Sequence, residues 1–320
     1  QGFAQAAKKY NYALPKIENS QVLEIKDGRH PVIERFLPLG EEYIPNDIYL
    51  DCKSQQIMMI TGPNMSGKSA LLRQTALTVI MAQMGSFVPA RACKIGVVDK
   101  IFTRVGASDN ISSGESTFMV EMNETSSIMN NLSENSLILL DEIGRGTSTY
   151  DGISIAWAIA TYLHEHPKFH PKTMFATHYH ELTDLANRID GVGNRHVAVQ
   201  EWEDRIVFLH RIRPGGTDRS YGVHVGRLAG IPETVLERAR SILDSMEVHH
   251  AADGVAQLVE QPALAAVEVE LLRRRERREV VVDVVQHGRE HHHTDQDPCV
   301  LLDQVQVGRC ARGDDLAEQR

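Results

Sequence analysis

Two short segments constrain the fold of this chain most. The first, residues 62–69, reads GPNMSGKS, fits the pattern G-x-x-x-x-G-K-[ST] and follows the apolar run 57–60. In this pattern a glycine-rich turn between a strand and a helix points backbone N–H groups at phosphate oxygens. The second, residues 136–142, is an apolar strand that ends in Asp141 and Glu142. Two such carboxylates can hold Mg²⁺ and orient an attacking water, so the pair predicts a nucleoside-triphosphate hydrolase.

The residues around the glycine-rich segment support a phosphate site. In the alternative interpretation, Gly62 and Gly67 merely end a strand and begin a helix. However, residues 57–60 read as a buried strand, and residues 68–84 carry apolar side chains at helical spacing. A lysine and a hydroxyl in the first turn of that helix lie where the dipole and unpaired N–H groups favour an anion. The predicted nucleotide-binding residues are Gly62, Pro63, Asn64, Met65, Ser66, Gly67, Lys68 and Ser69.

Composition and the termini set the outer limits. The 320 residues suffice for one large or two ordinary domains, and 42% are hydrophobic, enough for a core. No segment has the roughly 18 uninterrupted apolar residues of a membrane span, and the start has no signal-peptide layout, so we expect a soluble, cytoplasmic protein. The cysteines lack C-x-x-C spacing, which argues against zinc or a disulfide framework. Because the chain begins at Gln1 within a helical segment, we expect a fragment of a longer protein.

Strands alternate with helices along most of the chain. This order predicts an α/β fold with a mostly parallel sheet covered by helices. The expected strands are 57–60, 94–98, 101–104, 137–141, 173–177, 197–202 and 205–212. The expected helices are the segment up to about residue 12, then 68–84, 115–132, 153–165, 179–187, 221–229 and 232–247. From about residue 12 to residue 45 the sequence predicts irregular and extended structure.

Residues 251–320 differ in kind from the rest. They contain no Ile, Phe, Tyr, Trp, Met, Asn, Ser or Lys, and all nine basic residues are Arg. Nearly every residue is of a type whose codon can begin with G or C, which favours an out-of-frame or misjoined reading of GC-rich DNA. The alternative is a disordered tail rich in Arg and His. We assign this atypical tail no function.

Three further motifs surround the two principal segments. Residues 112–122, SSGESTFMVEM, form a serine- and glycine-rich turn that opens a helix, a second anion site suited to a γ-phosphate held by another subunit. Residues 144–152, GRGTSTYDG, are a glycine-rich run that precedes a helix. His178 follows a predicted strand and is placed at the carboxyl edge of the sheet, where α/β proteins bind ligands. It is therefore a candidate for contacting a γ-phosphate or its water.

These motifs together resemble one family closely. TGPNMSGKS, SGESTFMVEM, LLDEIGRGTSTYDG, FATHYHEL and SYGVHVGRLAGIP are similar, nearly word for word, to the ATPase domain of the bacterial MutS family of DNA mismatch-recognition proteins. The resemblance covers about residues 1–247. It implies an ABC-type P-loop ATPase followed by a C-terminal helix-turn-helix, with ATP and Mg²⁺ as cofactors. It also implies a homodimer with two composite ATP sites at the subunit interface.

The resemblance assigns roles to the motif residues. Asn64, Lys68 and Ser69 belong to the phosphate loop, and Ser69 and Asp141 bind Mg²⁺. Glu142 polarises the attacking water, and His178 senses the γ-phosphate. Two further roles concern other surfaces. Ser116 is the signature serine that reaches the partner's ATP, and Tyr43 and His210 enclose the adenine.

The resemblance also divides the chain. Residues 1–40 correspond to the end of the core and lever region and the start of the ATPase domain, which occupies 41–220. Residues 221–250 correspond to the helix-turn-helix, and 251–320 are the atypical tail. The second helix of the helix-turn-helix is too acidic to follow DNA phosphates, with Glu233, Glu237 and Asp244 against Arg238 and Arg240, so we expect it to pack in a dimer.

The implied function is to couple ATP binding and hydrolysis to mismatch recognition and repair signalling. The implied partners are mismatched double-stranded DNA, bound by N-terminal domains absent here, and a MutL-type protein, with no membrane and a cytoplasmic, nucleoid-associated location. Three alternatives remain: another ABC-type ATPase, an Smr-tailed paralogue and a nucleotide-gated dimerisation module. Other ABC-type ATPases carry an L-S-G-G-type signature, where this chain has residues 113–116, SGES. Ser66 stands where glycine is common, which a turn tolerates if φ is negative.

Overall fold

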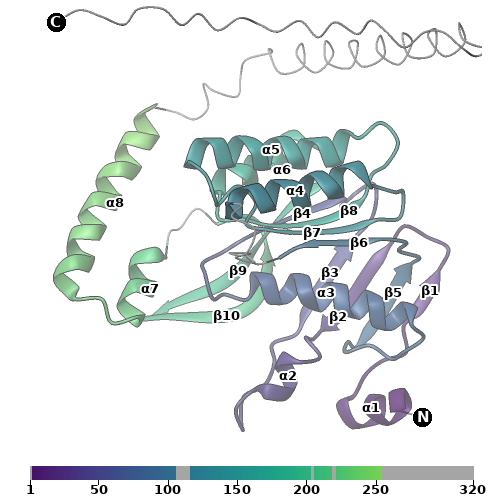
Figure 1. The fold of residues 1–320 in the computed structure, drawn as a ribbon. Helices are drawn as coiled ribbons and strands as arrows, with labels where there is room; N and C mark the ends of the chain where they lie inside the picture. Colours follow the sequence, from purple (N-terminus) through teal and green to yellow (C-terminus); the bar gives the residue numbers. More distant parts are fainter. Residues whose placement is uncertain (1, 106–115, 203–204, 218–220, 254–320) are drawn as a thin grey trace, which may run out of the picture. The chain divides into compact units, whose positions relative to one another are not determined.

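The computed structural model describes residues 2–105, 116–202, 205–217 and 221–253 (Figure 1). The chain forms two compact units, residues 1–243 and 244–320, and the elements below are described within the first except for the end of its last helix. The architecture is mixed α/β, as the alternation of strands and helices predicts. Most of the predicted tail, residues 254–320, lies outside the described residues.

A six-stranded sheet forms the centre of the first unit. Its order is β10 (Arg205–Pro214), β9 (Val192–Trp202), β4 (Ile57–Thr61), β8 (Lys172–Ala176), β7 (Leu137–Asp141) and β6 (Ile101–Arg104). All neighbouring pairs are parallel except β10 and β9, which pair in antiparallel fashion. Every residue of β4, β7 and β8 is buried, as expected for parallel strands covered on both faces. The prediction of a mostly parallel sheet is confirmed.

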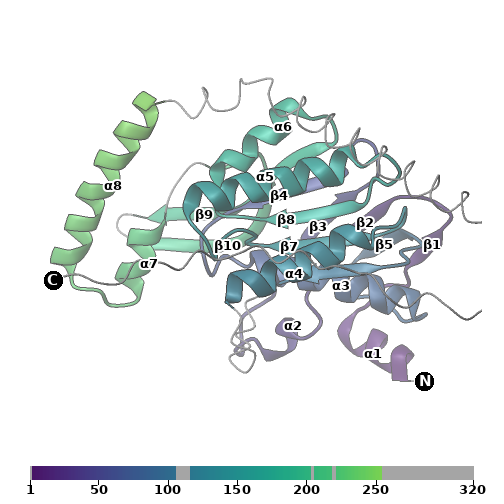
Figure 2. The same cartoon turned by 45° about the horizontal axis from the view of Figure 1, so that its top comes forward.

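Helices cover both faces of this sheet. One face carries α4 (Thr117–Asn130), α5 (Thr149–Glu165) and α6 (Leu185–Arg188), and the other carries α3 (Lys68–Gln83), as Figures 1 and 2 show. The alternation of β4 explains the arrangement, because Ile57 and Met59 join the core of the first face. Met58 and Ile60 join the core of the second face, together with residues of α3. The sheet is therefore a layer between two apolar cores.

A second, four-stranded sheet shares the core that contains α3. Its order is β1 (Lys16–Glu18), β5 (Ala92–Gly96), β2 (Leu23–Gly28) and β3 (Asn46–Leu50). Strand β2 is antiparallel to both of its neighbours, and β1 is parallel to β5. The extended structure predicted after residue 12 includes β1 and β2, but the sequence did not predict their pairing into a sheet. Leu23 and Ile25 are fully buried, and this alternation is too short to stand out in the sequence.

Two predicted helix boundaries also differ from the structure. Helix α5 begins at Thr149, four residues before the predicted start, because the Ser148 side chain accepts a hydrogen bond from the backbone N–H of Asp151. The predicted helix 179–187 is instead a 3₁₀ segment, η2 (His180–Asp184), followed by the single turn of α6. A 3₁₀ segment and an α-helix share a similar spacing of apolar residues, so the sequence did not separate them.

The remaining helices are short or terminal. They are α1 (Gly2–Tyr10), α2 (Ile33–Phe36), α7 (Gly222–Leu228) and α8 (Glu233–Asp253). Helices α7 and α8 match the predicted helical pair, and α8 continues beyond the predicted end at residue 247. Among the described residues, no helix is both long enough and apolar enough to cross a bilayer.

Candidate active site

The glycine-rich loop connects β4 to α3. Gly62 and Gly67 have φ values of 145° and 103°, which favour glycine, and a Cβ on Gly62 would lie 3.3 Å from the Ser66 Oγ. Ser66 itself does not have a positive φ, so the condition for accepting serine is met. The positive φ falls instead on Met65, at 66°. Met65 and Gly67, two of the three residues before α3, therefore have left-handed backbone conformations.

Lys68, the first residue of α3, folds back over this loop. Its side chain is buried, and its Nζ donates to the carbonyl oxygens of Gly62, at 2.8 Å, and Pro63, at 3.1 Å. Burial lowers the pKa of Lys68, whereas the nearby charges of Glu142 and Asp141 raise it. A cation is therefore held within hydrogen-bonding reach of the loop, beside two carboxylates.

Parallel strands bring the remaining predicted residues to the same edge of the sheet. Strands β7 and β8 pair in parallel, with Asp141 opposite Ala176, and the Glu142 N–H donates to the Ala176 carbonyl at 2.9 Å. His178 follows β8 by two residues, so it emerges beside Glu142. The expectation that His178 lies at the carboxyl edge, near the glycine-rich loop, is met by this geometry: its Nε2 is 3.2 Å from Lys68 Nζ.

Asp141 holds an unsatisfied oxygen at this edge. Its Oδ1 is buried without a hydrogen-bond partner among the described residues. Burial raises the pKa of Asp141, and a hydrogen bond from the Ser69 side chain opposes that shift. A buried, unpaired carboxylate oxygen is costly, and a hard cation would satisfy it. The Asp141 carboxylate and the Ser69 hydroxyl together fit Mg²⁺, which commonly takes one or two protein oxygens and completes its shell with water and phosphate. Within the described ranges, no group of three or more His, Cys, Asp or Glu side chains is arranged to hold a metal ion.

Glu142 lies in a strained and charged position. Its φ is 57°, which is uncommon for a residue with a Cβ. Its Oε1 lies 2.6 Å from His178 Nε2, and its Oε2 forms an ion pair with Arg145 Nη1. The hydrogen bond from His178, with a smaller contribution from Arg145, lowers the pKa of Glu142 to about 2 despite the opposing effect of burial. Glu142 is therefore ionised, with both oxygens engaged.

His178 Nε2 has two competing neighbours. It lies 3.2 Å from Lys68 Nζ and 2.6 Å from Glu142 Oε1. A ring nitrogen either donates its proton or accepts through its lone pair, so it cannot satisfy both groups at once. Donation to the carboxylate is the favourable arrangement, and it leaves the Lys68 ammonium bonded to the loop carbonyls. The ring therefore lies beside the Lys68 ammonium and forms its hydrogen bond with the carboxylate of Glu142.

The two predicted adenine-contacting residues have different hydrogen-bond partners. A bulge in β10 between Phe208 and Ile212 contains His210, whose φ is 48° and whose Nδ1 lies 2.9 Å from the Ser66 carbonyl. Tyr43 donates its hydroxyl to Gln74 Oε1 of α3 at 2.9 Å, and burial raises its pKa to about 12. In the described part of the chain no ring contact joins Tyr43 to His210, so their role as an adenine-binding pair stays a prediction.

Ser116 begins α4 as its N-cap. It is exposed, and its Oγ accepts from the Met119 N–H at 3.2 Å, which leaves the hydroxyl proton able to donate. The four preceding residues of the signature motif, 112–115, lie outside the described residues. The role of Ser116 toward a partner subunit stays a prediction.

Three contacts at this site were not anticipated. Arg145 pairs with Glu142, Glu121 of α4 accepts from the Gly144 N–H at 2.6 Å, and Tyr179 donates its hydroxyl to the Gly144 carbonyl at 2.9 Å. The sequence held one signal for Glu121, since this acidic residue stands among apolar ones in FMVEM. A carboxylate on an apolar helix face needs a buried partner, but the sequence does not say which.

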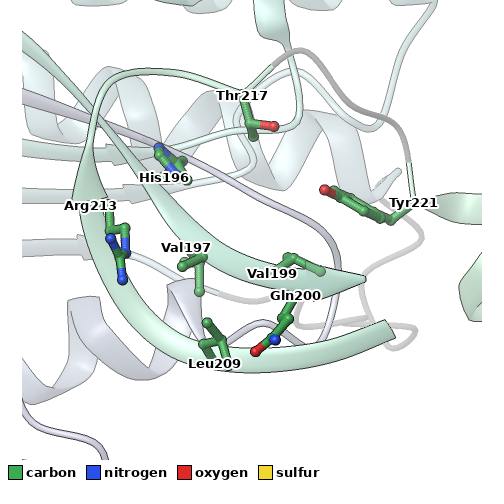
Figure 3. Close-up of a pocket in the computed structure, with 9 residues that line it drawn as sticks. His196, Val197, Val199, Gln200, Leu209, Arg213, Thr217 and Tyr221 are labelled. Carbon is green, nitrogen blue, oxygen red and sulfur yellow. The ribbon is translucent and has the colours of Figure 1, made fainter. Parts of the chain in front are cut away.

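A pocket of about 320 Å³ lies on the β9–β10 hairpin (Figure 3). Its walls include Val197 and Leu209 of the hairpin, and Thr217 and Tyr221 lie at its rim in Figure 3. None of the predicted nucleotide-site residues line it. Val197 lines the pocket and also lies next to the glycine-rich loop, because a Cβ on Gly62 would be 3.3 Å from it. The pocket is therefore adjacent to the loop but separate from the predicted nucleotide site.

Comparison with known proteins identifies the family. The profile of the family described as MutS domain V matches residues 58–247. A DNA mismatch repair protein MutS of Christiangramia forsetii is 60% identical over 261 residues, covering 82% of this chain and 30% of the relative. Those of Cytophaga hutchinsonii and Phocaeicola vulgatus are 62% and 58% identical, covering 79% and 80% of this chain and 29% of each relative. The chain spans about 30% of the length of these curated relatives. It belongs to the MutS family.

Proposed function

We propose that this chain is an ABC-type, Mg²⁺-dependent ATPase module of a DNA mismatch repair protein. The observation that carries the proposal is the convergence of Lys68, Asp141 Oδ1 and the Glu142–His178 pair at one edge of a parallel sheet, beside a glycine-rich loop. A lysine on a loop of backbone N–H groups, a metal-binding carboxylate and a water-orienting carboxylate are the parts that phosphoryl transfer needs.

The loop and α3 bind the phosphates in this proposal. The N–H groups at the start of α3 favour an anion, and Lys68 meets the β- and γ-phosphates after leaving its carbonyl partners. Bound Mg²⁺, held by Ser69 and Asp141, would neutralise charge on the phosphates. The unsatisfied oxygen of Asp141 then gains a partner, so the site is more favourable with the cation than without it.

Glu142 orients the attacking water. Its low pKa makes it a weak base, so its main contribution is a fixed negative oxygen that accepts a hydrogen bond from the water. His178 and Arg145 each contact one oxygen of Glu142, so an attacking water binds at a remaining lone pair or replaces one of these contacts. Arg145 is the more exposed of the two partners and is the one we expect to move. His178 stays beside Lys68, where it can sense the γ-phosphate.

The wider function follows from the relatives that share this region. They are named DNA mismatch repair proteins, and this chain corresponds to less than a third of their length. We infer that ATP binding and hydrolysis here are coupled to recognition of mismatched DNA by parts of the protein outside this chain. A MutL-type protein is the expected downstream partner, and the expected assembly is a homodimer through the ATPase domain.

Asp141→Asn tests the metal site. The amide keeps the shape of the side chain and removes the buried charge, so the melting temperature without ligand is expected to stay equal or rise. ATP affinity in the presence of Mg²⁺ is expected to fall to the value measured with EDTA. Calorimetric titration with ATP, with Mg²⁺ or EDTA, and thermal unfolding measure both effects. A variant that retains the full Mg²⁺ dependence of ATP binding would place the cation elsewhere.

Ser116→Ala tests the composite site. In the Glu142→Gln background, ATP stays unhydrolysed and is expected to favour dimers, because a ligand that binds only the dimer stabilises it by mass action. ADP lacks the γ-phosphate that Ser116 would contact and is expected not to do so. Adding Ser116→Ala is expected to reduce the ATP-dependent dimer fraction and to leave ADP affinity intact, as measured by sedimentation velocity and calorimetry.

The four combinations of nucleotide and Ser116 genotype act as controls for one another. Ser116 also caps α4, so a melting curve for each variant separates a loss of helix stability from a loss of the contact in trans. Equal dimer fractions in all four conditions would show that Ser116 does not act across a subunit interface in this chain.

A further inference from the structure

The peptide units of Gly144 are held from two directions. The Gly144 N–H donates to Glu121 Oε1 at 2.6 Å, and the Gly144 carbonyl accepts from the Tyr179 hydroxyl at 2.9 Å. Glu121 belongs to α4, and Tyr179 follows His178 after β8. Two elements far apart in the sequence therefore fix one residue of the loop that follows Glu142.

This loop has little space for any other arrangement. Gly144 has a φ of 88°, and a Cβ on it would lie 2.5 Å from the Gly152 carbonyl oxygen. A Cβ on Gly152 would lie 2.3 Å from both the Gly144 carbonyl oxygen and the Tyr179 hydroxyl. Since real Cβ atoms do not approach so closely, the two glycines allow the Tyr179 hydroxyl to reach Gly144.

Glu121 is itself fixed in place. Its side chain is 7% exposed, and its second oxygen, Oε2, lies 3.6 Å from Arg104 Nη2. Arg104 also pairs with Glu124, whose side chain is 45% exposed, at 2.9 Å. A buried carboxylate is retained only when it is paired and hydrogen-bonded, and here one of its oxygens is used on the backbone of the catalytic loop.

The position of Glu121 on α4 connects two predicted parts of the site. Ser116 caps this helix, and Glu121 lies five residues later, roughly 8 Å along the axis at 1.5 Å per residue. Gly144 lies two residues after Glu142, whose φ of 57° must be maintained by its surroundings. A displacement of the start of α4 would therefore be transmitted to the loop that carries Glu142.

We propose that Glu121 is a positioning residue for ATP hydrolysis, which holds the Gly144 N–H so that Glu142 keeps its orientation and links the helix capped by Ser116 to that loop. This inference rests on the proposed ATPase function. Glu121 touches neither nucleotide nor water in this role. Its effect therefore falls on the turnover rate and not on nucleotide affinity.

Glu121→Ala is the principal test. Because a misplacement of about 1 Å can cost up to roughly 100-fold in rate, we expect kcat for ATP to fall at least tenfold while the Kd for ATP changes less than about twofold. Glu121→Gln retains an oxygen that can accept from Gly144 and is expected to restore much of kcat. Glu124→Ala is the matched control, since it removes another acidic partner of Arg104 on the same helix without touching Gly144.

Tyr179→Phe tests the second contact of Gly144, the hydrogen bond to its carbonyl, and leaves no cavity because the ring is kept. It removes only the hydroxyl that reaches the Gly144 carbonyl, and we expect the same separation of kcat from Kd with a smaller, several-fold loss. Wild-type kcat in folded Glu121→Ala and in Tyr179→Phe would overturn the positioning role. Equal losses in Glu121→Ala and Glu124→Ala would assign the effect to Arg104 instead.

Hydrogen exchange of the Gly144 amide gives a readout independent of turnover. Protection is expected in the unsubstituted chain and in Glu124→Ala, and it is expected to be lost in Glu121→Ala. Absence of ATP turnover in the unsubstituted chain would contradict the proposed ATPase function, whatever the hydrogen exchange of Gly144 shows. Turnover in the unsubstituted chain, with unchanged Gly144 protection in Glu121→Ala, would remove the positioning role alone.

Discussion

Lys68→Ala is expected to weaken ATP binding by about 100-fold, since charge-assisted hydrogen bonds of about 3 kcal/mol correspond to two orders of magnitude in affinity. The ammonium contacts the glycine-rich loop directly, since its Nζ lies within 3.1 Å of two loop carbonyls. Alanine leaves the backbone N–H groups of the loop and α3 in place. The residual affinity therefore measures what the backbone contributes alone. Calorimetric titration with ATP and Mg²⁺ gives both values.

Lys68→Met is the matched control for this experiment. It keeps the length and apolar part of the side chain, which is buried, and removes only the charge. Both variants are expected to lose affinity to a similar extent. Lys68→Met would bind ATP with unchanged affinity if the Lys68 ammonium did not contact phosphate. That result would contradict the interpretation of residues 62–69 as a phosphate-binding loop. Thermal unfolding without nucleotide is expected to show no loss for Lys68→Met, because burial of the ammonium already disfavours its charged form.

The central sheet could be predicted because burial on both faces leaves a clear pattern in the sequence. Strands such as β4 and β7 are short apolar runs, and each is bounded by a change of composition, to a glycine-rich turn after β4 and to two carboxylates at the end of β7. The four-stranded sheet could not be predicted in the same way. Its strands, such as β2 with Leu23 and Ile25 inward, alternate over only a few residues and gain stability from pairing with β5, far along the chain.

The candidate site also has a part that could be predicted from the sequence and a part that could not. Asp141 ends β7, Gly62, Glu142 and His178 follow strands, and Lys68 begins the helix after β4. Parallel pairing of β4, β8 and β7 brings these strand ends to one edge. Their convergence could therefore be predicted from the topology. The orientation of Glu142 could not, because it depends on loop conformation and on side chains from other elements.

The contacts of the loop that follows Glu142 show why its conformation could not be predicted from the sequence. Arg145 is only three residues from Glu142, yet its ion pair depends on the turn between them. Glu121 and Tyr179 reach Gly144 from α4 and from the end of β8, and no periodicity relates the three positions. Tertiary contacts of this kind determine which of several polar residues in a motif face the reaction, so they appear only once the elements are assembled.

Glu142→Gln is expected to reduce ATP turnover by about 100- to 1,000-fold, the usual cost of removing one preorganised polar group from a reaction site. The amide keeps one oxygen that can accept from His178, so the shape of the site and its contact at 2.6 Å are largely retained. Loss of the negative charge removes repulsion toward the γ-phosphate, and ATP affinity is therefore expected to stay equal or increase. Steady-state hydrolysis and calorimetric titration on the same preparation separate the two quantities.

The same variant separates an ATPase from a nucleotide-gated dimerisation module in which hydrolysis is incidental. Arg145→Ala is the matched comparison, because it frees the Glu142 Oε2 while leaving the carboxylate and His178 in place. If Glu142 orients the water, Arg145→Ala retains turnover and Glu142→Gln loses it. Wild-type hydrolysis in Glu142→Gln would move the water-orienting role to another group, and His178, which lies 3.2 Å from the Lys68 ammonium, is the next candidate in the site. His178→Ala would then be expected to abolish the turnover that Glu142→Gln had spared.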